Sequence, residues 1–396
     1  MRLSLSRSEL ARRLETVRAE AAHRDLDALV LFSPTHVFYL TGLGFIATER
    51  PMALIITPKE TALFVPALET EHAEEEATVT RVVAYPEYPG EVHPMLRLKE
   101  LLSELRLGGA KLGADSDGYP GIWGYRGPKL SEVLSGAKVT VVKDLVEDLI
   151  KIKSSEEIEL IRESVRWGNL AHALLQEYTE PGRTETEIAL RASMEATLTM
   201  VRTLGPAYRA LAWHGAGAHA GFRGQIGKQS AIPHAITTNA KIARGDVLVT
   251  GAAASVSGYL SELERTMIVG TPTDEQARYF DLMVEVQQTA FDAIRPGARC
   301  SDVDRAVRKF FEAHDLAPYW RHHVGHSLGI GAHEAPFFDI GDDALIRPGM
   351  VFSVEPGIYI PEFAGFRHSD TVLVTETGME LLTYYPRDLA SLTISG

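Results

Sequence analysis

The second half of the sequence gathers histidine, glutamate and arginine into short segments with the character of buried strands and turns. These segments are 232–235, 257–266, 322–329, 332–336, 354–357 and 365–370. Histidines that titrate near neutral pH, placed beside paired carboxylates, can shuttle protons and form an anionic cradle. Such a cradle binds a cationic group, or a divalent metal where enough ligands converge. The residue types therefore indicate acid–base chemistry on a small polar substrate.

The composition limits which partners the protein can bind and which side chains can serve as ligands. The 396 residues are 45% hydrophobic and carry 53 Asp and Glu against 40 Lys and Arg, a net charge of −13. This acidic surplus argues against a nucleic-acid backbone or an anionic membrane as partner. The single cysteine, Cys300, excludes an intramolecular disulfide framework and a thiolate metal cage. Any metal or polar substrate must be bound by His, Asp and Glu.

The first 150 residues alternate between helix-like and strand-like stretches. Residues 9–24 have the pattern of an amphipathic helix, and the acidic run 69–76 that of a solvated helix face. Short apolar runs predict strands at 28–32, 53–56, 62–65, 80–84 and 139–142. This rhythm predicts an α/β domain over residues 1–150.

A second unit is expected over residues 151–396. Ser154 and Glu157 have the spacing of a capping box, which predicts that a helix begins there. Further helices are predicted at 184–199, 274–293 and 301–314, and strands at 246–249, 265–269, 350–360 and 371–374. Segregation of helices and strands favours an α+β domain. There is no GxGxxG after a strand and no GxxxxGK[ST], so no nucleotide-binding motif is predicted.

In their order and spacing, these segments resemble the pita-bread fold family of metallo-aminopeptidases, prolidases and creatinase. The resemblance is carried by Gly325-His326, by His333 seven residues later and by the Val354-Glu355-Pro-Gly segment. It extends over nearly the whole chain. It implies an α+β pita-bread catalytic domain preceded by an α/β creatinase-type N-terminal domain.

The family's peptidases hold two divalent metals with two Asp, one His and two Glu, and this sequence retains only part of that set. The five positions fall on Gly251, Glu262, His326, Glu355 and Ser369. Because two of the five cannot supply a carboxylate, a closed two-metal centre is not expected. The main expectation is that no metal cofactor is needed. The alternative is a single divalent Mn, Co or Zn held by Glu262, His326 and Glu355.

The motif detail is most similar to creatinase, the metal-free branch of the family. The match is tightest in Leu263-Glu-Arg-Thr266 and in the segment 296–302, and it extends to the segments 325–327 and 153–157. One departure is that approximately Phe337 stands where creatinase has a second arginine. The resemblance implies His234 as catalytic acid and base, Glu264 and Glu355 as the grip on a cationic group, and His326 as a further catalytic residue. It implies substrate-binding roles for Arg50, Glu262, His333 and Arg367.

Three functions remain open from the sequence. The leading hypothesis is a metal-independent hydrolase of an amide or amidine C–N bond in a small zwitterionic substrate, creatine-like or ectoine-like. The first alternative is a metal-dependent Xaa-Pro dipeptidase or aminopeptidase with a reduced metal site. The second is a non-catalytic binding pseudoenzyme. No role can be assigned to the histidines at positions 214, 219, 322, 323 and 368.

The expected assembly is a homodimer in which Arg50 reaches the neighbouring active site, as the resemblance implies. Apart from a small-molecule substrate, no nucleic-acid or membrane partner is expected. The N-terminus reaches charged residues too early for a signal peptide, and the longest apolar runs are far shorter than the roughly 20 residues that span a bilayer. A cytoplasmic location is therefore predicted.

Overall fold

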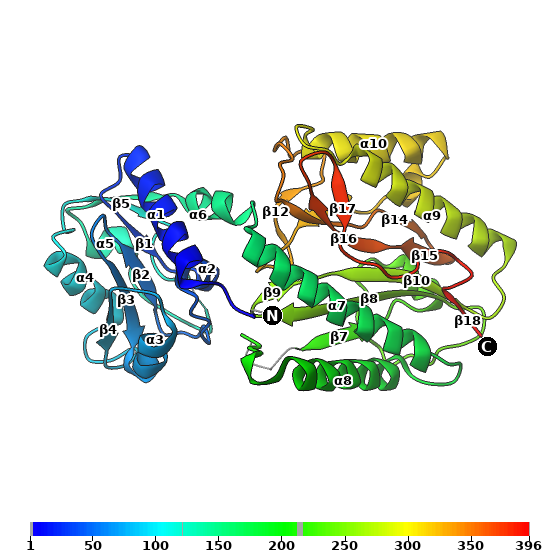
Figure 1. The fold of residues 1–396 in the computed structure, drawn as a ribbon, viewed down its shortest axis with the longest axis horizontal. Coiled ribbons are helices and arrows are strands. Elements are labelled where there is room, and N and C mark those ends of the chain that lie inside the picture. The colour runs from blue at the N-terminus through cyan, green and yellow to red at the C-terminus, as the bar shows by residue number, and fades with distance from the viewer. Residues whose placement is uncertain (1–2, 121, 212–216, 396) are drawn as a thin grey trace. The chain divides into compact units, whose positions relative to one another are not determined.

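The computed structural model describes residues 3–120, 122–211 and 217–395. The chain forms two compact units, of which the first runs to Ile150 and the second comprises nearly all of the chain from Lys151 onward (Figure 1). No helix within these described ranges is long and apolar enough to cross a membrane.

The first unit is built on a six-stranded mixed sheet in the order β4-β3-β2-β1-β5-β6. Its strands are β1 (Ala28–Leu31), β2 (Ala53–Ile56), β3 (Thr61–Pro66), β4 (Arg81–Tyr85), β5 (Lys111–Ala114) and β6 (Lys138–Val141). The strands β1, β2 and β3 are buried along their whole length, which explains their unbroken apolar runs. The sequence missed β5 because Leu112 is its one large apolar residue.

Short helices accompany this sheet. They are α1 (Arg7–His23), α2 (Pro34–Thr41), α3 (Thr70–Glu76), α4 (Pro94–Glu104), α5 (Leu130–Val133) and α6 (Lys143–Ile150), with the 3-10 turn η1 (Ala67–Glu69). The acidic run is helical as predicted, and Ala73 is the one buried residue of α3. The unit is an α/β domain with its core between the sheet and these helices.

The second unit holds a ten-stranded sheet with the main order β12-β11-β13-β16-β10-β8-β7, and a two-stranded sheet. The strands are β7 (Ala218–Gly221), β8 (Val247–Val256), β9 (Tyr259–Leu260), β10 (Leu263–Val269), β11 (His326–Ser327), β12 (Glu334–Phe337), β13 (Val351–Val354), β14 (Gly357–Ile360), β15 (Ala364–Arg367), β16 (Ser369–Val374), β17 (Met379–Leu381) and β18 (Thr393–Ile394). Within the larger sheet, β8, β10, β16 and β13 pair antiparallel in turn and form its centre.

Two pairs of long helices cover this unit (Figure 1). They are α7 (Ser155–Tyr178) with α8 (Glu185–Leu204), and α9 (Asp274–Ala293) with α10 (Cys300–Ala313); short 3-10 turns are η2 (Gly205–Ala207), η3 (Gly227–Ala231) and η4 (Ala317–Tyr319). The first pair packs on β7 and β8, and α9 packs on β13, β14 and β15. The predicted capping box starts α7: Ser154 Oγ accepts from Glu157 N at 3.4 Å, and Glu157 Oε2 accepts from Ser154 N at 2.8 Å.

The prediction of one strand over 350–360 is wrong. The segment divides at Glu355-Pro356 into β13, which lies in the large sheet, and β14, which pairs with β15 in the small one. Because proline lacks an N–H to donate, it interrupts the strand at this point. Glu355 therefore stands at the corner where the chain leaves one sheet for the other.

Strand register places three residues of interest in one row. Glu264 on β10 lies opposite Gly251 on β8 and opposite Ser369 on β16. Residues that are directly opposite in neighbouring strands project to the same face of a sheet. The two positions that lack the expected metal-binding carboxylates thus flank a glutamate.

Candidate active site

Glu262 enters the site from the short link between β9 and β10. Its backbone is fixed by Thr371 of β16, which donates to Glu262 O at 2.8 Å and accepts from Glu262 N at 3.0 Å. Its carboxylate accepts a hydrogen bond from Ser369 Oγ at 2.7 Å. One of the two altered family positions therefore orients Glu262 through a hydroxyl group, where the family supplies a carboxylate.

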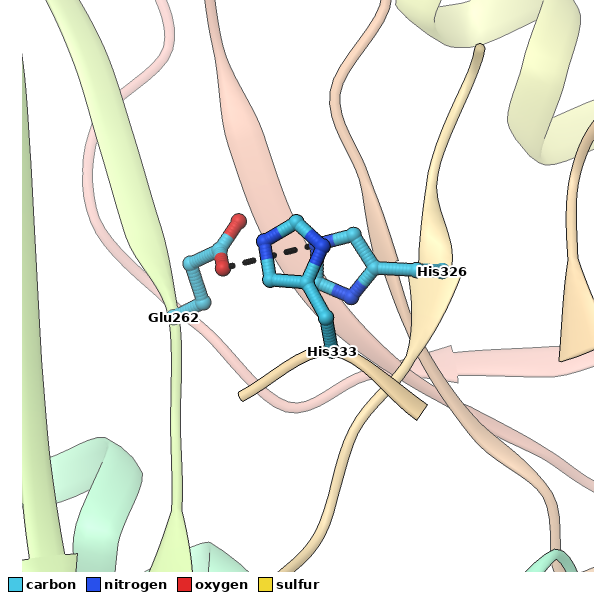
Figure 2. Close-up of side chains that lie close together, drawn as sticks. All are labelled: Glu262, His326 and His333. Carbon is cyan, nitrogen blue, oxygen red and sulfur yellow. Dashed lines mark ion pairs between the residues drawn. The ribbon is translucent and has the colours of Figure 1, made fainter. Parts of the chain in front are cut away.

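His326 begins β11 and is fully buried. The preceding residue must be glycine, because a Cβ at Gly325 would lie 2.1 Å from the carbonyl oxygen of Ser353. The two backbones therefore run close together where the imidazole of His326 meets the carboxylates. Its Nε2 lies 3.2 Å from Glu355 Oε1 and 3.7 Å from Glu262 Oε2, and Figure 2 shows the Glu262 carboxylate directed at the ring. His333 stacks on His326 with 3.7 Å between ring centroids.

Glu264 is held by the protein's own arginines. The guanidinium of Arg367 donates to both of its carboxylate oxygens, and Arg223 donates to one of them. Arg367 also donates to the Tyr359 hydroxyl at 2.9 Å and lies 4.0 Å from Glu355. The sequence assigned Glu264 to a cationic substrate and Arg367 to substrate binding. In the structure, these two buried side chains bind each other.

The charges of this cluster shift one another's pKa values. Burial and the carboxylates of Glu355 and Glu264 raise the pKa of Glu262. Burial alone would raise the pKa of Glu355, but the neighbouring His326 and Arg367 lower it. Burial alone would lower the pKa of His326, but the two carboxylates raise it to about 9. The site thus holds one carboxylate that stays ionised and one that readily keeps a proton.

These shifts predict a pH dependence of stability for the metal-free protein. Because the pKa of His326 is raised in the folded state, its contribution is fully present below its ordinary value of about 6.5 and is lost as the pH rises towards 9. The wild-type protein should therefore have a higher free energy of unfolding than His326→Gln at pH 6. This difference between the two proteins should shrink by on the order of 3 kcal/mol when the pH is raised to 9.5. Urea unfolding of both chelator-treated proteins measures this difference, and an equal difference at the two pH values would contradict the assignment.

The site opens into a cavity of about 580 Å³ that lies within the second unit. That volume is in the usual range for sites that bind small molecules. Glu262, Glu264 and His333 line it together with Arg223 and His219, and much of the remaining wall is apolar. The cavity therefore offers an acidic and imidazole-bearing region, a guanidinium and apolar surface to one small ligand.

The structure places the other predicted residues as follows. His234 follows η3, is exposed, and lies close enough to His333 for its charge to affect that residue's pKa. Arg50 belongs to the first unit, where Glu49 and Glu87 bind its guanidinium. Its role in a partner's site stays a prediction.

The histidines without an assigned role differ in their surroundings. His219 lines the cavity, and His322 lies 2.8 Å from the Tyr359 hydroxyl. His323 packs on Phe337, and His368 is buried against Phe280. His214 lies outside the described residues. Cys300 is buried, which raises its pKa to about 12 and fits the structural role that its lack of a partner base indicates.

Sequence reasoning missed Arg223. It falls in no recognised motif, yet it contacts Glu264 and lines the cavity beside Glu262. The available signal was the glycine that follows it, since an isolated glycine beside a short apolar stretch often marks a turn.

Comparison with known proteins matches both units. Residues 159–376 match metallopeptidase family M24, and residues 13–149 match the creatinase/prolidase N-terminal domain. The chain belongs to metallopeptidase family M24. It is a hydrolase of the creatinase and Xaa-Pro peptidase family, and the predicted pita-bread fold with a creatinase-type N-terminal domain is confirmed.

Relatives of this M24 protein match it along almost its whole length. The Xaa-Pro dipeptidase of Pyrococcus furiosus is 30% identical over 95% of this chain and 99% of its own length. The dipeptidase PepE of Mycobacterium ulcerans shares the fold with a TM-score of 0.82 and 26% identity, covering 99% of this chain and 100% of its own. The prolidase of Pyrococcus horikoshii gives a TM-score of 0.79 at 26% identity, over 96% of this chain and 99% of its own.

The names of these relatives bear on the branch of the family. All three are dipeptidases or prolidases, so they do not support the sequence-based preference for creatinase. Creatinase and prolidase share the N-terminal domain, which therefore cannot separate the two branches.

Proposed function

We propose that this chain hydrolyses the C–N bond of a small dipeptide, of the Xaa-Pro type, with one divalent cation held by Glu262, His326 and Glu355. The observation that carries the proposal is that the carboxylates of Glu262 and Glu355 both approach the buried imidazole nitrogen of His326. His326 Nε2 makes no hydrogen bond within the described residues, although two carboxylates approach it. The dipeptidase names of the relatives support the same substrate class.

The donor set fits one cation. Two groups of ligand atoms lie within 4.8 Å of one another, Glu262 with His326 and His333, and Glu262 with Glu264 and Glu355. The proposed set of Glu262, His326 and Glu355 joins the two groups, because His326 Nε2 lies 3.7 Å from Glu262 and 3.2 Å from Glu355. Carboxylate oxygens with one imidazole suit Mn, Co or Zn. Glu264 is already bound by two arginines, and Gly251 and Ser369 offer no carboxylate, so the residues do not fit the full two-metal set.

The residues of the chain divide the work of hydrolysis. A bound divalent cation supplies polarisation of the scissile carbonyl and a more acidic water. His333, which lies on the cavity wall against His326, can donate a hydrogen bond to the oxyanion. His234, exposed beside it, can deliver a proton to the leaving nitrogen. Arg367 keeps Glu355 ionised, so that this carboxylate stays a ligand.

The test is metal stoichiometry together with activity. Protein treated with chelator and then dialysed should lose at least about a hundredfold in kcat/KM for Gly-Pro and Ala-Pro, and one equivalent of Mn²⁺, Co²⁺ or Zn²⁺ per chain should restore it. Elemental analysis counts the bound metal. Two equivalents bound to the wild-type chain would contradict the proposed single site.

A matched variant restores the missing ligands. A Cβ at Gly251 would lie 3.5 Å from Glu264 Oε1, 3.8 Å from Glu264 Cγ and 3.9 Å from Arg223 Cζ, so a side chain can begin there without a clash. The double variant Gly251→Asp, Ser369→Glu should raise the metal content above one per chain. If the folded double variant binds no more metal than the wild type, then the loss of the two carboxylates is not the sole reason why a second ion is excluded, and the arginines at Glu264 exclude it as well.

A metal-independent hydrolase with an amidine substrate is the second candidate. The specific observation in its favour is Glu262, whose raised pKa suits a group that accepts and donates a proton near neutral pH. Full activity on creatine or a cyclic amidine in protein that elemental analysis shows to be metal-free would establish this candidate and exclude the first.

A further inference from the structure

Arg223 stands on a strained turn at the cavity wall. It follows β7 with a left-handed backbone, φ +51°, and Gly224 continues with φ +74°. A Cβ at Gly224 would lie 2.3 Å from the carbonyl oxygen of Ile236, so no other residue fits. A left-handed conformation at a non-glycine residue costs on the order of 1 kcal/mol, and such strain gathers at functional sites. The turn therefore directs the Arg223 side chain at an energetic cost.

A buried carboxylate holds this turn in place. Glu185, at the start of α8, accepts from Gly224 N at 2.8 Å through one oxygen. Its other oxygen accepts from Thr238 N at 2.9 Å and Ala240 N at 3.2 Å. Because Glu185 is only 1% exposed, these bonds are shielded from water. The backbone that carries Arg223 is fixed before any ligand binds.

The guanidinium of Arg223 has hydrogen-bond donors that no described residue accepts. Its Nη2 donates to Glu264 and, at 3.3 Å, to Gln225 Oε1, whereas Nε and Nη1 donate to no described residue. The side chain is 47% exposed and lines the cavity. Arg223 and Arg367 share the single carboxylate of Glu264, so this trio has an excess of one positive charge. A guanidinium fork with free donors matches a carboxylate in both charge and shape.

The cavity wall carries charged groups that can contact the two ends of a substrate. Glu262 and His333 line it together with Arg223, and apolar wall is supplied by Ala189, Leu190, Phe222 and Leu260. We propose that Arg223 binds the carboxylate of the substrate and thereby makes the site specific for ligands with a free carboxyl group. This inference rests on the proposed dipeptide hydrolysis, with the scissile bond at Glu262 and His333.

The test compares substrates with and without the carboxylate. Arg223→Met should lower kcat/KM for Ala-Pro at least about tenfold, the usual scale for a hydrogen bond to a charged group, and change that for its C-terminal amide less than about threefold. Arg223→Lys keeps the positive charge but loses the forked guanidinium, so its kcat/KM for Ala-Pro should lie between those of the wild type and Arg223→Met. Arg367 still neutralises Glu264 in these variants, which keeps the fold intact. Arg202→Met, exposed on α8, is the matched control.

Binding separates this inference from the proposed activity. The probe is the reduced-bond analogue of Ala-Pro, as free acid and as amide, titrated calorimetrically into wild type and Arg223→Met. Tighter binding of the acid that disappears in Arg223→Met supports the carboxylate site even if no dipeptide is cleaved, in which case the proposed activity alone fails. Equal binding of acid and amide by the wild type, or equal losses for both in Arg223→Met, overturns the inference even if Ala-Pro is hydrolysed.

Discussion

Replacing His326 by alanine is expected to lower kcat/KM for Xaa-Pro dipeptides by about a thousandfold, within the range set by losing a group at the reacting centre. Its imidazole is buried and faces Glu355 at 3.2 Å and Glu262 at 3.7 Å. Without it, the two carboxylates of the metal-free protein would lose the imidazole between them, and in the metal-bound protein proposed above the cation would lose its one nitrogen ligand. Steady-state kinetics and elemental analysis of the same preparation measure both losses.

A histidine outside the site provides the control for this experiment. His314, exposed at the end of α10, stacks on Phe310. The variant His314→Ala should keep its activity and its metal content. If His326→Ala binds metal as the wild type does and retains more than about a tenth of its kcat/KM, then His326 has no part in the centre.

The largest effect on stability is expected at Arg265, which is 1% exposed. It pairs with Asp370 through two hydrogen bonds of 2.8 and 3.2 Å and also donates to the carbonyl oxygens of Tyr385 and Pro386. Arg265→Met leaves Asp370 buried without its main countercharge. Breaking a buried pair in this way costs about 3–5 kcal/mol, which urea unfolding at pH 7 should show.

An exposed pair of the same geometry is the natural comparison. Arg162 binds Glu380 with two hydrogen bonds of 2.7 and 2.8 Å, but both side chains are partly in solvent. Arg162→Met should cost less than about 1 kcal/mol, because solvent screens the exposed charges. Similar losses in the two variants would mean that burial does not determine the cost of breaking these pairs.

The sequence was informative about the fold where the apolar pattern was strong. The helix predicted at 274–293 is α9 with the same bounds, and the strand predicted at 53–56 is β2. Helix α9 carries apolar residues at helical spacing, which define one buried face, whereas β2 is an unbroken apolar run that is buried on both faces. The predicted strand at 350–360 failed because its apolar residues continue across Pro356, while the chain changes sheet there.

The segments predicted to form the site lie close together in the structure, whereas the roles predicted for their individual residues stay predictions. The segments that contain Glu262, His326 and Glu355 were identified from their motifs, and the structure brings the three together. The pairing of Glu264 with Arg367 depends on the register of β10 and on the path of β15, which residue types alone do not encode. Arg223 was invisible for the same reason, since its role arises from a turn held by the distant Glu185.

The row formed by Gly251, Glu264 and Ser369 affects how the site responds to changes in the concentrations of metal ions. Where the family's peptidases hold two divalent cations taken from the surrounding pool of ions, one half of this site, at Glu264 between Gly251 and Ser369, carries the guanidinium groups of Arg223 and Arg367, which are part of the chain. That half cannot be emptied by metal starvation or misloaded by a tighter-binding ion such as Cu²⁺, which outcompetes most first-row metals. If the proposed cation binds, exposure to mismetallation is thereby confined to its position at Glu262, His326 and Glu355.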